Sequence, residues 1–216
     1  SALATVALGA AVRGDDDPET AVELLAEAVA LSETGGHPVI TSLALVVQGY
    51  AALDRGDLDG AQSAAFRASA LLAGLDLEPH ASLGASVLLA QVHRARGELE
   101  DALATLDAAL SATDRPALLF PLRQARAHRA GVLLQLGRAE EALATARSAV
   151  DVPGEDVRSE VVAWRALAAA LRGCGQPEQA REAVARALAA ARATGQRSEL
   201  AATERLAAEL GLPAGG

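Results

Sequence analysis

The segment Gly97-Glu-Leu-Glu-Asp-Ala102 is one of four short stretches in which a glycine ends one apolar segment and an alanine soon begins the next. The other three run from Gly56 to Ala61, from Gly137 to Ala142 and from Gly175 to Ala180, and Gly14 to Ala21 repeats the pattern with a longer turn. The four alanines lie 41, 40 and 38 residues apart. Self-similarity at a nearly fixed period of this size is typical of stacked repeats. The sequence therefore predicts a repeat array.

The composition predicts helices throughout. Hydrophobic residues make up 51% of the 216 residues and are mainly Ala and Leu, whereas aromatic residues make up 2%. Strands favour β-branched and aromatic side chains, so this composition indicates an all-α fold. Apolar residues recur at steps of three and four, and prolines precede long proline-free stretches. The expected helices run over residues 2–13, 18–34, 38–55, 57–74, 79–96, 98–112, 118–136, 138–150, 155–173, 177–194 and 197–210.

These helices form five antiparallel pairs and one extra helix. The apolar stripe of helix 98–112 is too broad for one partner helix to cover, so successive pairs must stack. No linker is long or polar enough to divide the chain, and we expect a single repeat domain over residues 1–216. Its repeats cover residues 1–36, 37–77, 78–115, 116–153 and 154–195, followed by a capping helix at 196–211.

Charge and residue usage exclude several classes of protein. All 19 basic residues are Arg, so no lysine is present for a phosphate-binding loop, a Schiff base or a kinase site. The net charge of −9 is spread along the chain, which argues against direct nucleic-acid binding. No apolar run is long enough to span a membrane. Cys174 is alone and supports no internal disulfide. These features together fit a reducing cytoplasm.

The sequence offers no catalytic motif. The histidines His37, His80, His93 and His128 include no pair at the spacing of a helix-borne metal site. Neither Gly-x-Ser-x-Gly nor His-Glu-x-x-His occurs. We therefore expect no enzyme activity, no metal and no cofactor.

The fifth repeat carries the resemblance to a known family. Its first helix reads Trp164-x-x-Leu167-Ala168-x-x-Leu171, and its second helix supplies Ala180 and Ala187 at two close-packing positions. This pattern resembles the tetratricopeptide repeat (TPR). The resemblance implies a right-handed superhelical α-solenoid in which Trp164 is largely buried and His93 occupies a core position. A HEAT-like array is the alternative, because its longer period fits equally well.

Three features depart from the family pattern. The period is 38–41 residues instead of 34, as in longer variants from bacterial signal-transduction regulators. Repeat four places Arg126 and Arg129 where large apolar residues are expected, so either they extend to solvent or the register differs there. Pro121 also bears on this register, because a proline in the interior of a helix is costly. In the last segment Glu204 stands at a packing position, which suggests a capping helix, with a shortened sixth repeat as the alternative.

The resemblance also implies a binding surface. First helices of successive TPR units line a concave groove, and the side chains expected to face it are Leu43, Val46, Tyr50, Leu53, Val87, Gln91, Arg94, Gln124, Leu134, Gln135, Val162, Arg165 and Arg172. Some of these side chains could instead be buried against neighbouring helices. The Lys and Asn with which chaperone-binding members clamp a peptide carboxylate are absent.

Arginine could replace the absent Lys and Asn, because a guanidinium can hold a carboxylate through two hydrogen bonds. We therefore expect Arg94, Arg165 and Arg172 to attract an acidic peptide segment. The alternative is that each pairs with a Glu on a neighbouring helix.

These observations predict a non-catalytic module of a larger bacterial regulator, which binds a protein or peptide segment in its groove. The alternative is a small-molecule effector-sensing domain of a large transcription activator. A homo-oligomeric contact is a third hypothesis.

Overall fold

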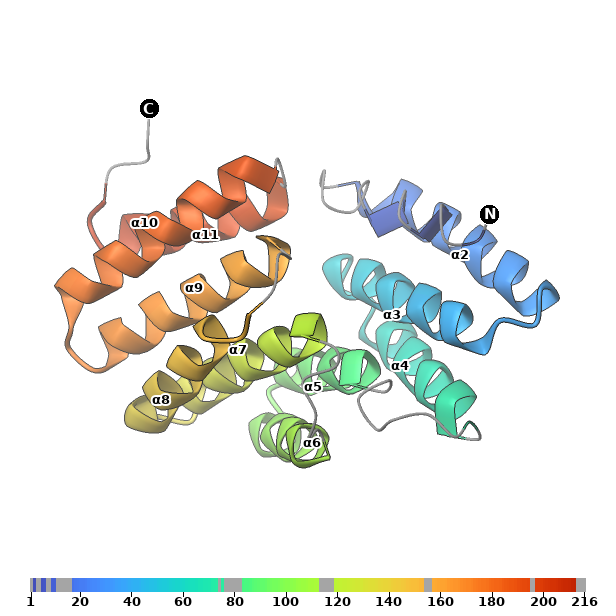
Figure 1. Ribbon diagram of the computed structural model, residues 1–216, viewed down its shortest axis with the longest axis horizontal. Helices are drawn as coiled ribbons and strands as arrows, with labels where there is room; N and C mark the ends of the chain where they lie inside the picture. Colours follow the sequence, from blue (N-terminus) through green and yellow to red (C-terminus); the bar gives the residue numbers. More distant parts are fainter. Residues whose placement is uncertain are drawn as a thin grey trace. The chain divides into compact units, whose positions relative to one another are not determined.

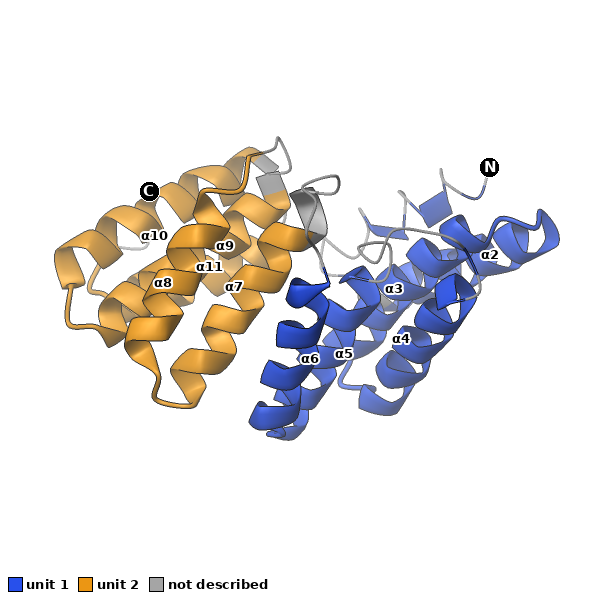
Figure 2. Ribbon diagram, turned by 60° about the horizontal axis from the view of Figure 1, so that its bottom comes forward, with its two compact units in different colours: residues 1–114 blue, residues 115–216 orange. Residues whose placement is uncertain are grey.

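The computed structural model describes residues 2, 5, 6, 9, 10, 17–73, 75, 83–112, 119–153, 157–194 and 197–212. Its helices are shown in Figure 1. The chain divides into two compact units, Ser1–Asp114 and Arg115–Gly216, which are coloured separately in Figure 2. Ten α-helices and no strand occur in the described residues, which confirms the all-α prediction. The single-domain arrangement and the right-handed superhelix stay predictions.

Unit 1 contains five of these helices. They are α2 (Pro18–Thr34), α3 (Pro38–Asp54), α4 (Leu58–Ala73), α5 (Leu83–Arg96) and α6 (Leu99–Ser111). Consecutive helices pack against one another from α2 to α6, and α3 also contacts α5. The helix expected to begin at residue 79 is described from Leu83 onward, and His80 lies outside the described residues. The described residues of the expected first helix, among them the buried Val6, are helical.

Unit 2 contains the other five helices. They are α7 (Leu119–Gln135), α8 (Ala139–Val150), α9 (Val157–Gly173), α10 (Pro177–Thr194) and α11 (Arg197–Glu209). The pairs α7/α8 and α9/α10 pack as hairpins, and α9 also contacts α7 and α8. The observed ends differ from the expected ones by no more than about two residues, which is within the usual uncertainty of helix ends.

One turn geometry recurs in every hairpin. Gly97 follows α5 with φ of 82°, a left-handed conformation that favours glycine. Its N–H donates to the carbonyl of Arg94, and the next N–H, of Glu98, donates to the carbonyl of His93 at 2.9 Å. This is a Schellman motif, which pairs the last carbonyls of the helix. The same bonds recur at Gly56, Gly137 and Gly175, so the repeated glycines are explained by backbone geometry.

The repeated alanines are packing residues. Ala61, Ala102, Ala142 and Ala180 are all completely buried. In unit 1, Ala61 shares a core cluster with Ala65, Leu88 and Val92, which come from α4 and α5. A methyl side chain lets two helix axes approach closely. The strict recurrence of alanine therefore reflects close helix crossings.

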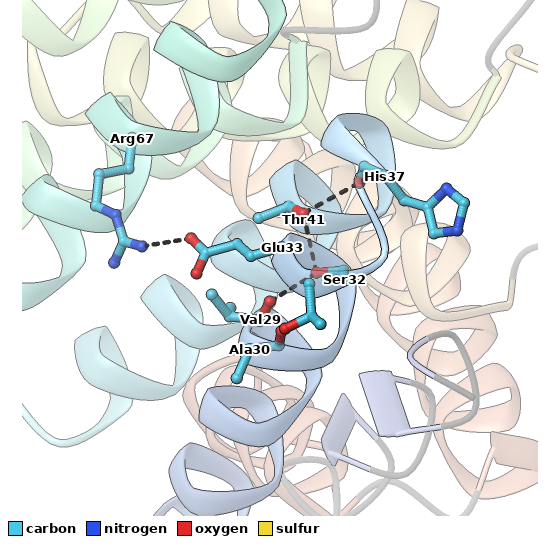
Figure 3. Close-up of polar contacts among 8 residues, drawn as sticks. Val29, Ala30, Ser32, Glu33, His37, Thr41 and Arg67 are labelled. Carbon is cyan, nitrogen blue, oxygen red and sulfur yellow. Dashed lines mark hydrogen bonds and ion pairs between the residues drawn. The ribbon is translucent and has the colours of Figure 1, made fainter.

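A buried polar contact joins α2 to α3 at the boundary of the first two repeats. Ser32 on α2 donates to the carbonyl of Val29, and its Oγ lies 2.9 Å from Oγ1 of Thr41 on α3 (Figure 3). Thr41 Oγ1 is also 3.0 Å from the carbonyl of His37. Both hydroxyl groups are therefore paired inside the core, as buried polar groups require.

The uncertainty about repeat four is resolved in the α7/α8 hairpin. Pro121 is the third residue of α7, within the first turn, where an N–H would have no intrahelical acceptor. Arg126 and Arg129 are partly buried and reach α8 instead of extending to solvent. Arg126 Nη1 donates to the carbonyl of Ser148 at 2.9 Å, and Arg129 Nη1 donates to Thr145 Oγ1 at 2.8 Å. Polar contacts thus replace the expected apolar ones in this interface.

Trp164 contacts both helices of its own hairpin. Its side chain is partly buried, and Nε1 donates to Glu160 Oε1 at 3.2 Å. The guanidinium of Arg186 on α10 lies 4.8 Å from the ring centroid, within reach of a cation–π interaction. Its contact with a neighbouring repeat stays a prediction.

The last helix, α11, packs on both α10 and α9. Thr203, Leu206 and Ala207 are its buried side chains, and Leu210 just after the helix is also buried, while Glu204 is partly buried. Arg181 on α10 donates to the carbonyl of Leu210 at 3.1 Å, just beyond the end of α11. This helix occupies the position that the first helix of a sixth repeat would take.

Candidate functional site

An exposed apolar face runs along α3 in unit 1. Val39 is 52% exposed and Leu43 is 45% exposed, and they lie one turn apart on the same side of the helix. Tyr50 and Leu53 continue this row toward the end of α3 and are partly buried. We call the side chains of Val39, Leu43, Tyr50 and Leu53 the α3 face. Large apolar side chains at such exposure often mark a place where another molecule binds.

Two valines expected in the groove belong to the core of unit 1 instead. Val46 is buried in the cluster that contains Leu45 and Ala85, and a Cβ added at Gly84 on α5 would lie 3.8 Å from its Cγ1. Val87 is also buried. The contact between α3 and α5 covers these side chains because adjacent first helices pack closely. Gln91 and Arg94 on α5 are partly buried.

In unit 2 the expected groove residues differ in burial. Val162 is buried with Ala127 and Ala149, so it too is a core residue. Gln124 and Leu134 are partly buried, whereas Gln135 is exposed. No large hydrophobic side chain of the described part of unit 2 is as exposed as Leu43. The exposed apolar character is thus found in unit 1.

The two arginines of α9 are engaged by α11. Arg165 Nη1 lies 2.7 Å from Glu199 Oε2, and Arg172 forms an ion pair with Glu209. Arg165 and Glu199 are partly buried, so this pair is screened less than a surface pair. The structure therefore shows the alternative in which each arginine pairs with a Glu on a neighbouring helix. An acidic partner would have to share these guanidinium groups with the two carboxylates or displace them.

A pocket of about 220 Å³ lies between α2 and α4 and is also lined by α3 and the turn that follows it. Its polar lining comprises Gln48, Arg55, Asp57, Ser63 and Arg67, and its apolar lining comprises Val22, Ala52 and Ala64 with Gly60. Arg67 also pairs with Glu33 of α2 at 3.2 Å (Figure 3). The carboxylate of Asp57 is occupied in part by the N–H of Gly60, at 2.9 Å. The pocket thus presents two guanidinium groups against one carboxylate.

His93 does not have the surroundings expected of a core histidine. It is partly buried, and its Nδ1 lies 2.6 Å from Glu98 Oε2 across the turn between α5 and α6. Asp101 adds a second carboxylate, and the three ligand atoms lie within 4.8 Å of one another. Spacing on a single helix could not reveal this group, because its members come from both sides of a turn.

Two titratable groups of unit 2 have shifted pKa values. Burial raises the pKa of the Cys174 thiol, and the nearby Glu140 carboxylate raises it further. The hydrogen bond from Arg138 lowers the pKa of Glu141. The first shift makes the thiol a poorer nucleophile at neutral pH, and the second belongs to a surface ion pair.

Among the helices of the described residues, none combines the length and the apolar character that crossing a lipid bilayer requires.

Known structures define the class of fold. No family model matches the chain, and no curated protein sequence matches it. A thermophilic TPR protein of Thermus thermophilus matches with a TM-score of 0.68 and 22% identity, over 98% of this chain and 100% of that one. BtubC of P. vanneervenii matches with a TM-score of 0.63 and 18% identity, over 92% and 85% of the two chains.

A third match is longer than this chain. Aspartyl phosphate phosphatase F of Bacillus subtilis matches with a TM-score of 0.67 and 14% identity, over 97% of this chain but 56% of its own length. The chain therefore has a TPR-like helical-repeat fold, which confirms the resemblance carried by the fifth repeat.

Proposed function

We propose that this chain is a non-catalytic protein-interaction module that binds an apolar segment of a partner protein on the α3 face. The observation that carries this proposal is the exposure of Val39 and Leu43 on a first helix, the kind of helix that lines the groove in TPR-like arrays. An exposed Leu and Val one turn apart can accept two anchor side chains of a helical or extended segment. A surface built on rigid helices loses little conformational entropy on binding.

Further features of unit 1 support a peptide as the occupant. Tyr50 and Leu53 pack in part against the core and continue the apolar row toward the end of α3, so the row is longer than a compact metabolite requires. The partner segment would thus be mainly apolar. Its affinity would come chiefly from the apolar anchors, because surface ion pairs contribute little.

The test is selection of peptides from a random display library on the isolated chain, followed by binding measurements on substituted chains. Leu43→Glu should weaken the selected peptides at least about tenfold, since it places a charge beneath an apolar anchor. Leu31→Glu is the matched control, because Leu31 on α2 is also 45% exposed. Equal effects of the two substitutions, or no effect of Leu43→Glu, would contradict the proposal.

A second candidate function is suggested by the pocket between α2 and α4. Its two arginines, Arg55 and Arg67, suit a small effector that carries a carboxylate or a phosphate. This corresponds to an effector-sensing domain within a larger bacterial regulator. A panel of organic acids and phosphate esters, tested by calorimetry, should then include one that binds the chain and loses affinity with Arg55→Gln. A panel without binders would leave the α3 face as the functional surface.

A further inference from the structure

One corner of unit 1 brings three potential metal ligands together. His93 lies in the last turn of α5, Glu98 immediately precedes α6, and Asp101 lies in the first turn of α6. The ligand atoms of these side chains lie within 4.8 Å of one another. A small shift of side-chain torsions would bring all three within bonding distance of one cation. The corner is open to solvent, because both carboxylate residues are exposed.

The other repeats show how this corner is normally built. The equivalent positions hold Ala52, Asp57 and Gly60 in repeat two, Leu133, Arg138 and Glu141 in repeat four, and Leu171, Gln176 and Gln179 in repeat five. In repeat two the Asp57 side chain caps α4 through the N–H of Gly60. In repeat four Arg138 forms two hydrogen bonds with Glu141, at 2.7 and 2.6 Å. The acidic side chain is thus used in a cap in repeat two and in an ion pair in repeat four, and repeat five has none at these positions.

Repeat three uses neither arrangement. Glu98 makes no side-chain cap with α6, and its carboxylate turns back to His93. Position 101 carries a second carboxylate where repeat two has glycine. Position 93 carries an imidazole where the other three repeats have alanine or leucine. In repeat three, one imidazole and two carboxylates therefore occupy positions that in the other repeats hold an apolar residue and a pair that is neutral, capped or ion-paired. Two carboxylates held this close favour a cation between them.

The backbone holds these residues in place. The Schellman turn at Gly97 pairs the carbonyls of His93 and Arg94 with the N–H groups of Glu98 and Gly97. The three ligands lie within a span of nine residues, 93–101, and both flanking helices pack into the core. The ligands are consequently presented by a rigid hairpin, which lowers the ordering cost of binding.

We propose that His93, Glu98 and Asp101 form a binding site for a divalent transition-metal ion such as Zn²⁺. An imidazole with two carboxylates suits Zn²⁺, Co²⁺ and Ni²⁺, whereas Mg²⁺ and Ca²⁺ prefer sets composed of oxygen atoms. Three protein ligands leave one position of a tetrahedral ion for water or for a group from a partner. This site is independent of the proposed peptide-binding surface.

The test is titration of the chain, without a polyhistidine tag, with Zn²⁺ by calorimetry and with Co²⁺ by visible absorption. We expect one site, and we expect His93→Leu to weaken Zn²⁺ binding by more than about tenfold, since loss of even an outer-shell partner commonly costs that much. His93→Leu should fold normally, because Leu133 and Leu171 occupy the equivalent position. Zn²⁺ should raise the melting temperature of the unsubstituted chain and not that of this variant.

Two control variants make the result specific. Glu141→Gln removes a carboxylate from the equivalent corner of repeat four, and His37→Ala removes an exposed histidine from the same unit. Neither variant should change the Zn²⁺ affinity. The proposal is overturned if Zn²⁺ does not bind, if His93→Leu binds it equally well, or if Mg²⁺ competes equally with Zn²⁺.

Discussion

Arg126 on α7 donates from Nη1 to the carbonyl of Ser148, 2.9 Å away in the last turn of α8. The last four carbonyls of a helix receive no hydrogen bond from an N–H of the same helix, and the helix dipole makes that end negative. A guanidinium at this position therefore donates to a carbonyl that has no partner within the helix, and it interacts favourably with the negative end of the helix dipole. Arg123, one turn earlier on α7, donates in the same way to the carbonyl of Val152 beyond α8.

The first prediction concerns this contact. Arg126→Leu restores the apolar residue of the TPR pattern, yet it should lower the free energy of unfolding by about 1–2 kcal/mol because the Ser148 carbonyl loses a charged donor. Urea denaturation followed by circular dichroism measures the change. Arg192→Leu, at an exposed position of α10, is the control and should change stability by less than about 0.5 kcal/mol. A more stable Arg126→Leu variant would show that the family pattern outweighs this hydrogen bond.

The second prediction concerns the repeated alanines. Ala102→Leu and Ala142→Leu should each destabilise the chain by roughly 1–3 kcal/mol, because the added atoms enter close helix crossings. Ala104→Leu and Ala144→Leu are matched controls on the same two helices, at exposed positions, and should be nearly silent. The four urea midpoints test the packing model directly. Similar midpoints for all four variants would contradict it.

The third prediction concerns the reactivity of Cys174. Because burial and Glu140 raise the pKa of its thiol, the thiolate fraction at neutral pH is small, and alkylation by iodoacetamide should be slower than in the unfolded chain. The rate should keep rising at alkaline pH where that of an ordinary thiol has levelled off. Glu140→Gln should lower the pKa and increase the rate at neutral pH. A rate independent of Glu140 would assign the shift to burial alone.

Much of the fold could be predicted from local chemistry. The glycine turns and the alanine period identify helix ends and hairpins, because a Schellman motif depends on a single left-handed residue and a close crossing depends on a single small one. The contacts of Arg126 could not be predicted this way. They depend on the distance between α7 and α8, and a pattern of apolar positions carries no information about carbonyl groups on the neighbouring helix.

The candidate site was predictable only in part. The family register places Leu43 and Tyr50 on an outward face of α3, but Val46, Val87 and Val162 follow the same register and are buried. Burial depends on how closely adjacent first helices approach, which differs from repeat to repeat. The pairing of Arg165 with Glu199 required knowledge of the α11 position. The group around His93 could not be predicted from helical spacing, because His93 and its two carboxylate neighbours lie on opposite sides of a turn.

The final prediction uses two glycines whose substitution should have opposite effects. A Cβ added at Gly49 on α3 would lie 2.3 Å from Leu88 Cδ2 and 3.1 Å from Ala64 Cβ, and Leu88 is completely buried and has little room to move. Gly49→Ala should therefore destabilise the chain by about 1–3 kcal/mol, despite the better helix propensity of alanine.

At Gly84 on α5, an added Cβ would meet only Val46 Cγ1, at 3.8 Å, which is an ordinary contact. Gly84→Ala should accordingly stabilise the chain by about 0.5 kcal/mol, because the unfolded chain loses conformational freedom. Urea denaturation of both variants measures whether each substitution raises or lowers the free energy of unfolding. Destabilisation by Gly84→Ala would mean that the α3/α5 contact is tighter than the structure shows, and a neutral Gly49→Ala would mean that α3, α4 and α5 cross less closely.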